Sequence, residues 1–217
     1  MTKFIAAASA LALASVACAD IYSDATFDTF TNENGNLDIA SVEVTNDATN
    51  LYISVTTRDF ASWTKYMVFM NTQGGGNGSN AWNRPVNLNG QTADHFIGSW
   101  VDQGSNNQQL VAFNNGGWDW GNVIVSSNSV GGSTVTFTCS LSSLGLGIGS
   151  TMRFDVATSG GGDGDSGIDH LSRDTQSTDW WTNPSTAGSF LSYTVVPAPG
   201  AIALLGVAGL VGGRRRR

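Results

Sequence analysis

Short runs of alternating apolar and polar residues, separated by turns rich in glycine and asparagine, most constrain the fold of this chain. Between residues 20 and 195, no segment has the length and the 3.6-residue period of a good helix. The strand-like runs are residues 37–45, 51–57, 66–71, 95–100, 109–113, 123–127, 134–139, 152–158 and 190–196. Runs of this length and period predict an all-β chain.

Turn signals punctuate these runs. Asn-Gly pairs occur at residues 34–35, 77–78, 89–90 and 115–116, and residues 130–133 read Val-Gly-Gly-Ser. Such residues favour tight turns, so we expect residues 130–133 to join their two neighbouring strands in a hairpin. Short strands at this spacing predict a two-sheet antiparallel β-sandwich, with a barrel as the second choice. No internal repeat indicates a solenoid or a propeller.

The C-terminal tail, residues 196–217, has three parts. The first is Val196, Pro197, Ala198, Pro199 and Gly200; an apolar run over residues 201–213 follows, and then come Arg214, Arg215, Arg216 and Arg217. About 19 uncharged residues, at ~1.5 Å of helix rise each, match the thickness of a bilayer core. Arginines are costly at mid-membrane and stay on the cytoplasmic side. The tail therefore predicts one transmembrane helix after an extended, protease-accessible proline strip.

This order of parts resembles the PEP-CTERM sorting domain. The resemblance implies that an exosortase, a membrane-embedded cysteine transpeptidase, cuts at the proline motif and moves the protein to the cell surface or the extracellular matrix. Ala198 stands where the family's name-giving motif has glutamate, so the match is to a Val-Pro-Ala-Pro variant. A simple single-pass membrane anchor is the alternative.

The N-terminus predicts export. Lys3 precedes an apolar core at residues 4–16, and Ala17, Cys18 and Ala19 supply the small residues that signal peptidase reads, so residues 1–19 are interpreted as a signal peptide. Cys18 raises a lipoprotein alternative, although Ser15 is unusual for a lipobox. Cleavage after Ala19 leaves Cys139 as the remaining cysteine, so no intrachain disulfide is expected. We expect the Cys139 thiol to be buried and inert.

Residues 20–195 are expected to form one domain with an acidic surface. They contain five basic residues against seventeen acidic ones, a net charge of −12. Such a surface repels phosphates, so we expect no binding to nucleic acid or to anionic lipid headgroups. Strong acidity suits a secreted protein bathed in salt or divalent cations.

Several segments of this domain resemble DOMON-like and family 9 carbohydrate-binding sandwiches. The likeness starts at residues 37–55, where an aspartate, a strand and an Asn-Asp turn precede Leu-Tyr at the start of the next strand. Residues 66–71, 93–97, 140–145 and 152–156 resemble later elements of the same group. The resemblance implies a non-catalytic β-sandwich that often binds sugars or, in some branches, haem.

Two tryptophan clusters are candidates for sugar binding. Aromatic rings stack on the C–H faces of sugars while carboxylates and amides bond the hydroxyl groups. The candidates are Trp118, Asp119 and Trp120 in one cluster and Trp180, Trp181 and Asn183 in the other. In a strand Trp118 and Trp120 would share a face, which fits either a stacking platform or core packing. Trp63, Trp82 and Trp100 are assigned mostly to packing.

A glycine-rich acidic loop is the candidate calcium site. Asp163, Asp165 and Asp169 stand at i, i+2 and i+6, and hard oxygen ligands on a turning backbone suit calcium. The loop is no EF-hand, because Asp174 occupies the position of the usual glutamate. A solvated acidic loop without metal is the alternative.

No motif of a hydrolase, a phosphate loop or a dinucleotide site appears. The resemblance to haem-binding sandwiches also allows a redox function. In that case the haem ligands would be His95 or His170 together with Met67, Met70 or Met152. We therefore expect an exported cell-surface or matrix protein that binds extracellular polysaccharide without catalysis. A structural matrix protein without a small ligand and, further behind, a secreted glycoside hydrolase are the alternatives.

Overall fold

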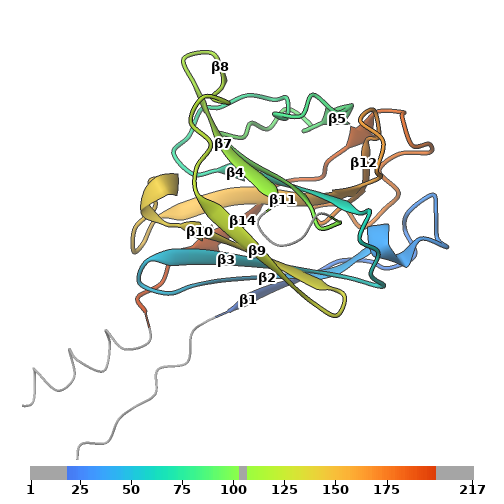
Figure 1. The fold of residues 1–217 in the computed structure, drawn as a ribbon, viewed down its shortest axis with the longest axis horizontal. Helices are drawn as coiled ribbons and strands as arrows, with labels where there is room; N and C mark the ends of the chain where they lie inside the picture. The colour runs from blue at the N-terminus through green and yellow to red at the C-terminus, as the bar shows by residue number, and fades with distance from the viewer. Residues whose placement is uncertain (1–18, 103–106, 199–217) are drawn as a thin grey trace, which may run out of the picture.

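The computed structural model describes residues 19–102 and 107–198, and this part of the chain is all-β (Figure 1). Two main sheets contain antiparallel pairings throughout, an arrangement consistent with a β-sandwich. Two 3-10 turns, η1 (Gly35–Leu37) and η2 (Ser142–Leu144), interrupt the strands. Within the described ranges, no helix is long and apolar enough to cross a bilayer. Nearly all of the predicted signal peptide and the tail from Pro199 onward lie outside these ranges.

The first sheet contains five strands. Their order is β1 (Asp20–Ser23), β2 (Ile39–Asn46), β3 (Asn50–Thr57), β10 (Thr134–Ser140) and β9 (Ser126–Gly131). Alternate residues of these strands, such as Ile53 and Phe137, point into the protein and are fully buried. On the opposite face the Ser54 and Thr136 hydroxyl groups are 2.9 Å apart. One apolar face and one polar face are what a sheet exposed to water on one side requires.

The second sheet contains seven strands. Its path is β12 (Gly167–His170), β11 (Thr151–Ser159), β4 (Lys65–Asn71), β6 (His95–Trp100), β7 (Gln108–Asn114) and β8 (Gly117–Trp118), and β14 (Leu191–Thr194) also pairs with β11. A small parallel pair, β5 (Val86–Asn87) with β13 (Ser185–Thr186), lies among the loops.

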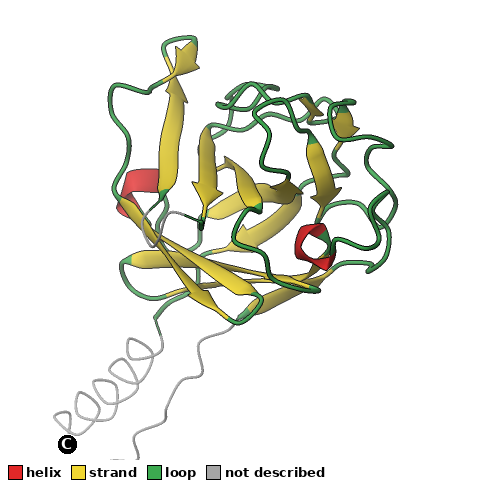
Figure 2. Cartoon of the chain, turned by 45° about the vertical axis from the view of Figure 1, so that its right-hand side comes forward, coloured by secondary structure: helices red, strands yellow, loops and turns green. Residues whose placement is uncertain are grey.

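The second sheet is covered on both faces. The inner core lies between the two sheets and includes Phe137, Tyr66 and Phe154. The outer core lies on the other face and contains Met67, Phe69, Val86, Leu88, Ala93, Phe96, Val111, Ala157 and Phe190. Long loops gather over this outer face (Figure 2). Residues 66–70 of β4 are therefore all buried, the continuous pattern of a strand with no solvent face.

Most of the predicted strands are confirmed to within two residues at their starts. The predicted hairpin is confirmed as well: β9 and β10 pair up to Gly131 and Thr134, with Gly132 at φ 63° in the two-residue loop. The strand predicted at residues 123–127 is wrong in position, because β9 starts at Ser126 and Val125 is 89% exposed. Strands β1, β5, β8, β12 and β13 were not predicted, since four or fewer residues carry no clear period.

Candidate functional site

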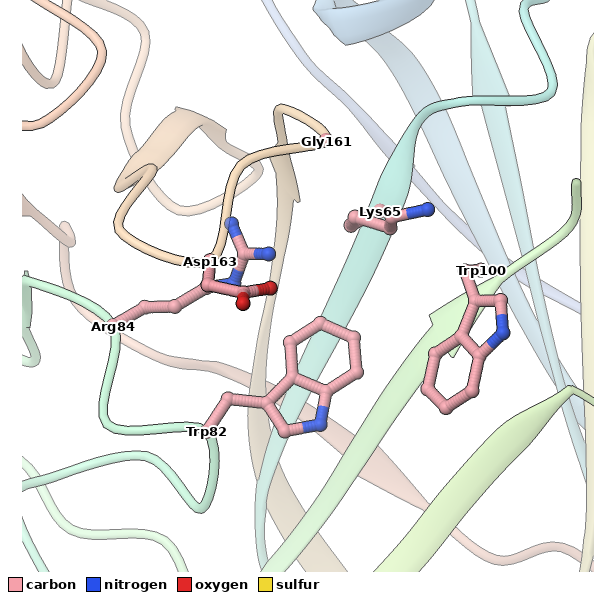
Figure 3. Close-up of a pocket in the computed structure, with 6 residues that line it drawn as sticks. All are labelled: Lys65, Trp82, Arg84, Trp100, Gly161 and Asp163. Atoms are coloured by element: carbon pink, nitrogen blue, oxygen red, sulfur yellow. The ribbon is translucent and has the colours of Figure 1, made fainter.

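A pocket of about 590 Å³ opens beside the outer core. Its lining residues are Lys65, Trp82, Arg84, Trp100, Gly161 and Asp163, and Figure 3 shows the two indole rings standing side by side. Two aromatic faces, two cationic groups and one carboxylate thus converge on one cavity. This is the composition of a site that binds a polar ligand with apolar faces.

Strand register explains the floor of the pocket. Lys65 of β4 lies opposite Trp100 of β6, and Ser159 of β11 lies opposite Lys65 on the other side. Side chains of a strand alternate between faces, so Lys65 shares a face with Met67 and Phe69 of the outer core. The pocket is consequently the solvent-facing end of the outer core.

Trp82 is held in a fixed orientation by its contacts. Its Nε1 donates a hydrogen bond to Gln109 Oε1 at 2.8 Å, and its ring meets Phe96 edge-on at 5.6 Å between centroids. The ring also lies against Gly98, where any β-carbon would overlap it. The Trp82 and Trp100 centroids are 5.9 Å apart at an interplanar angle of 43°. The two rings therefore form an angled aromatic pair before any ligand arrives.

Arg84 forms one wall and is buried. The Asn80 side chain accepts from the Arg84 N–H and donates to the Arg84 carbonyl, which fixes this part of the loop. Arg84 Nη1 donates to Ser159 Oγ at 2.7 Å and to the Asp165 carbonyl at 3.0 Å. Burial lowers the pKa of Arg84, and the charges of Asp165 and Asp163 oppose that shift. A guanidinium remains protonated in any case, so the wall is cationic.

The rest of the rim is polar. Lys65 Nζ lies 3.1 Å from Asp102 Oδ2, and the exposed Asp163 belongs to the loop after β11. That loop is closed by a hydrogen bond of 2.9 Å from the Gly162 N–H to Asp165 Oδ2. Lys65 can donate and Asp163 can accept hydrogen bonds, which suits the hydroxyl groups of a sugar.

The first predicted tryptophan cluster does not form a flat platform. Strand β8 ends at Trp118, and the Trp120 N–H donates to the Trp118 carbonyl at 3.1 Å, so the chain turns between the two. The Trp118 ring packs on Phe113 at 5.4 Å, whereas Trp120 is 43% exposed. Asp119 accepts hydrogen bonds from Asn114 and Asn122. The expectation that Trp118 and Trp120 share a strand face is therefore corrected.

The second predicted cluster lies against Phe30. The Trp181 and Phe30 centroids are 5.4 Å apart and edge-on, and Trp180, at 58% exposed, is 6.2 Å from the same ring. Asn183 Nδ2 donates to Asp179 Oδ1. None of these residues lines the pocket, and neither do Trp118, Asp119 and Trp120. Trp82 and Trp100, which the sequence had assigned mostly to packing, do line it.

The three aspartates of the predicted calcium loop are not brought together. Asp163 lines the pocket, Asp165 bonds within its own loop, and Asp169 is buried in β12. Asp169 Oδ2 accepts from the Ile39 N–H at 2.6 Å. In the described ranges, the three carboxylates close enough to share an ion are Asp28, Asp38 and Asp169. The structure therefore does not bring the predicted ligand set together, because Asp169 belongs to β12 and not to the glycine-rich loop.

One buried network has the connectivity of a hydrolase triad. His170 Nδ1 lies 2.7 Å from Asp155 Oδ2, and His170 Nε2 lies 3.1 Å from Ser185 Oγ. All three residues are 0% exposed, so the serine hydroxyl is not accessible to a substrate. The network joins β11, β12 and β13 and satisfies buried polar groups.

The residues named for haem ligation do not fit that role. Both ring nitrogens of His170 are engaged. His95 has its Nδ1 2.9 Å from Asp94 Oδ1, and the residue is only 3% exposed, so it does not face an open space. Met67, Met70 and Met152 are fully buried side chains of the two cores. An axial ligand needs a free nitrogen or sulfur that faces a haem-sized space.

The described part of the predicted sorting motif begins just after the last described strand, β14. Val196 is half-buried, and Pro197, which follows it, is exposed and outside any strand. The Asn46 side chain accepts from the Val196 N–H at 3.0 Å and donates to the Val196 carbonyl at 2.9 Å. Pro199, Gly200 and Arg214 to Arg217 lie outside the described residues. A search against protein-family models and a search of curated proteins each found no match to this chain.

Proposed function

We propose that this chain is an exported surface or matrix protein whose β-sandwich binds extracellular polysaccharide at the Trp82–Trp100 pocket, without catalysis. The observation that carries the proposal is the angled pair of indole rings, 5.9 Å apart, in a cavity of about 590 Å³. Sugar rings present C–H faces that stack on indole, and a preset ring orientation reduces the entropy lost on binding.

The charges around the pocket support a sugar ligand. Lys65 and Arg84 are two of the five basic residues between positions 20 and 195, and both line this pocket. Asp163 adds a carboxylate to the same rim. Donors and an acceptor around two apolar faces match the alternation of hydroxyl groups and C–H faces on a polysaccharide.

The test is binding of the purified full chain, in detergent, to a panel of neutral and acidic polysaccharides. We expect Trp100→Ala and Trp82→Ala to weaken binding at least about tenfold, the loss of one well-packed contact. Trp180→Ala and Trp120→Ala are the matched controls, because both remove a more exposed tryptophan outside the pocket. Melting curves separate lost binding from lost folding, and Trp100→Phe should restore part of the affinity.

Two outcomes would favour the other functions. Binding that depends on Trp180 or Trp120 and is indifferent to Trp82 and Trp100 would move the site to the clusters predicted from sequence. No binding to any polysaccharide would favour a structural matrix protein. Release of new reducing ends from a bound polysaccharide would favour the glycoside hydrolase.

For localisation, we propose export by signal peptidase and sorting through the proline, apolar and arginine segments by an exosortase-type enzyme. The support within the described residues is an exposed Pro197 directly after the anchored Val196, which leaves this proline accessible after the last strand. The mass of protein recovered from the cell surface should lack the signal peptide and roughly the last twenty residues. A retained tail would favour a simple membrane anchor, and full-length protein in the cytosol would contradict export.

A further inference from the structure

A cluster of carboxylates lies where the N-terminal segment meets β12. One oxygen from each of Asp28, Asp38 and Asp169 lies within 4.8 Å of the other two. Asp28 precedes η1, Asp38 follows it, and Asp169 belongs to β12, more than a hundred residues away. The fold therefore holds together three groups that repel one another.

Three carboxylate oxygens of this cluster lack a hydrogen-bond partner among the described residues, whereas both oxygens of Asp169 accept hydrogen bonds from backbone N–H groups. Asp38 is 0% exposed; its Oδ2 accepts from the Phe27 N–H and from Arg58 Nε, but its Oδ1 has no hydrogen bond among the described residues. Both oxygens of Asp28 are also buried and without a partner. In the part of the chain that the structure describes, thirteen buried side-chain atoms lack a partner, and six of them lie within residues 24–38. Buried polar groups are normally satisfied, so this concentration points to an additional ligand.

The charge balance points the same way. In the described part of the chain, the salt bridge that reaches the three carboxylates of the cluster is the one between Arg58 and Asp38, at 3.0 Å. One guanidinium cannot neutralise three ionised carboxylates.

We propose that Asp28, Asp38 and Asp169 bind a calcium ion that ties the N-terminal segment to β12. Two oxygens that share a calcium ion at about 2.4 Å are at most about 4.8 Å apart, and the three carboxylates meet that limit. Calcium accepts several carboxylates in irregular geometry, whereas magnesium demands a near-octahedral shell and retains waters. The site is separate from the pocket, because none of its ligands lines that cavity.

The experiment uses the purified full chain after treatment with EDTA. Calorimetric titration with calcium chloride should give one site per chain. Calcium about 100-fold above the dissociation constant should raise the melting temperature by roughly 5 °C or more. Magnesium chloride should bind more weakly. Absence of both the heat and the thermal shift with calcium would overturn the proposal.

Asp28→Asn is the sharpest variant, because neither Asp28 oxygen accepts a hydrogen bond in the described residues. It removes a negative charge and breaks no side-chain hydrogen bond of Asp28 among the described residues. In EDTA the variant should melt at or above the wild-type temperature, since repulsion is relieved; in calcium it should melt below the wild type. Asp163→Asn, from the loop predicted by sequence, is the matched control and should bind calcium normally. Calcium binding lost in Asp163→Asn and kept in Asp28→Asn would reject this ligand set.

Discussion

The indole ring of Trp82 lies directly on the backbone of Gly98, so that glycine at position 98 and tryptophan at position 82 depend on each other. Gly98 is in β6, and it pairs with Met67 of β4, a residue of the outer core. A side chain at position 98 would occupy the space that the ring fills. The Trp82 wall of the pocket can therefore occupy its position only because residue 98 has no β-carbon.

Gly98→Ala should therefore displace Trp82 from the pocket. We expect a loss of about 1–3 kcal/mol in the free energy of unfolding, typical of overpacking, and weaker polysaccharide binding. Chemical denaturation and a binding assay measure the two effects. Gly117→Ala is the control, because a β-carbon there meets nothing within 4 Å. Unchanged binding by a folded Gly98→Ala protein would contradict the role of the Trp82 wall.

Asn46 should control how firmly the sandwich holds the start of the proposed sorting motif. Its side chain makes hydrogen bonds to both the N–H and the carbonyl of Val196 and is 3% exposed. Asn46→Ala should cost about 1–3 kcal/mol and speed amide exchange at Val196. Hydrogen-exchange mass spectrometry checks this, with the exposed Asn122→Ala as control. Equal protection of Val196 in wild type and Asn46→Ala would refute the anchor.

Cys139 should be unreactive in the folded protein. It is buried in β10, and burial raises the pKa of its thiol to about 12. The thiolate is the reactive form, so almost none is present at pH 8. A thiol reagent should label Cys139 in the native chain only at the rate of unfolding, and in the denatured chain at once. Rapid labelling without denaturant would show an accessible thiol instead.

Asp47 should make stability depend on acid pH. Its pKa is lowered, first by the hydrogen bond from the Tyr52 hydroxyl and then by those from the backbone N–H groups of Thr49 and Asn50. A lowered pKa in the folded state contributes stability above the ordinary value of about 3.8, and this is lost as pH falls through the folded value.

Asp47→Asn should accordingly cost about 1 kcal/mol at pH 7, and the difference from the wild type should shrink below about pH 4. Urea denaturation of both proteins at pH 7 and below about pH 4 measures this difference in the free energy of unfolding. Glu43→Gln, an exposed change on β2, is the control. A difference that stays constant across the acid range would assign the effect to packing and not to charge.

The sequence alone predicted the strands and the sheet class, because alternation in β2, β3 and β10 reflects local contact with one core. It also predicted the β9–β10 hairpin, since glycine at position 132 is a local requirement of a tight turn. The sequence alone could not predict the outer core, because the loops that cover it have no regular alternation of apolar and polar residues.

The candidate sites were decided by the tertiary structure. Trp82 and Trp100 meet only because a loop folds back over β6, and Asp28, Asp38 and Asp169 meet only because an N-terminal segment reaches β12. Sequence reasoning proposed tryptophan for stacking and aspartate for metal, but it grouped residues that are neighbours along the chain. Local periodicity is written into a single strand, whereas the convergence of side chains depends on which strands pair and where the loops between them pack.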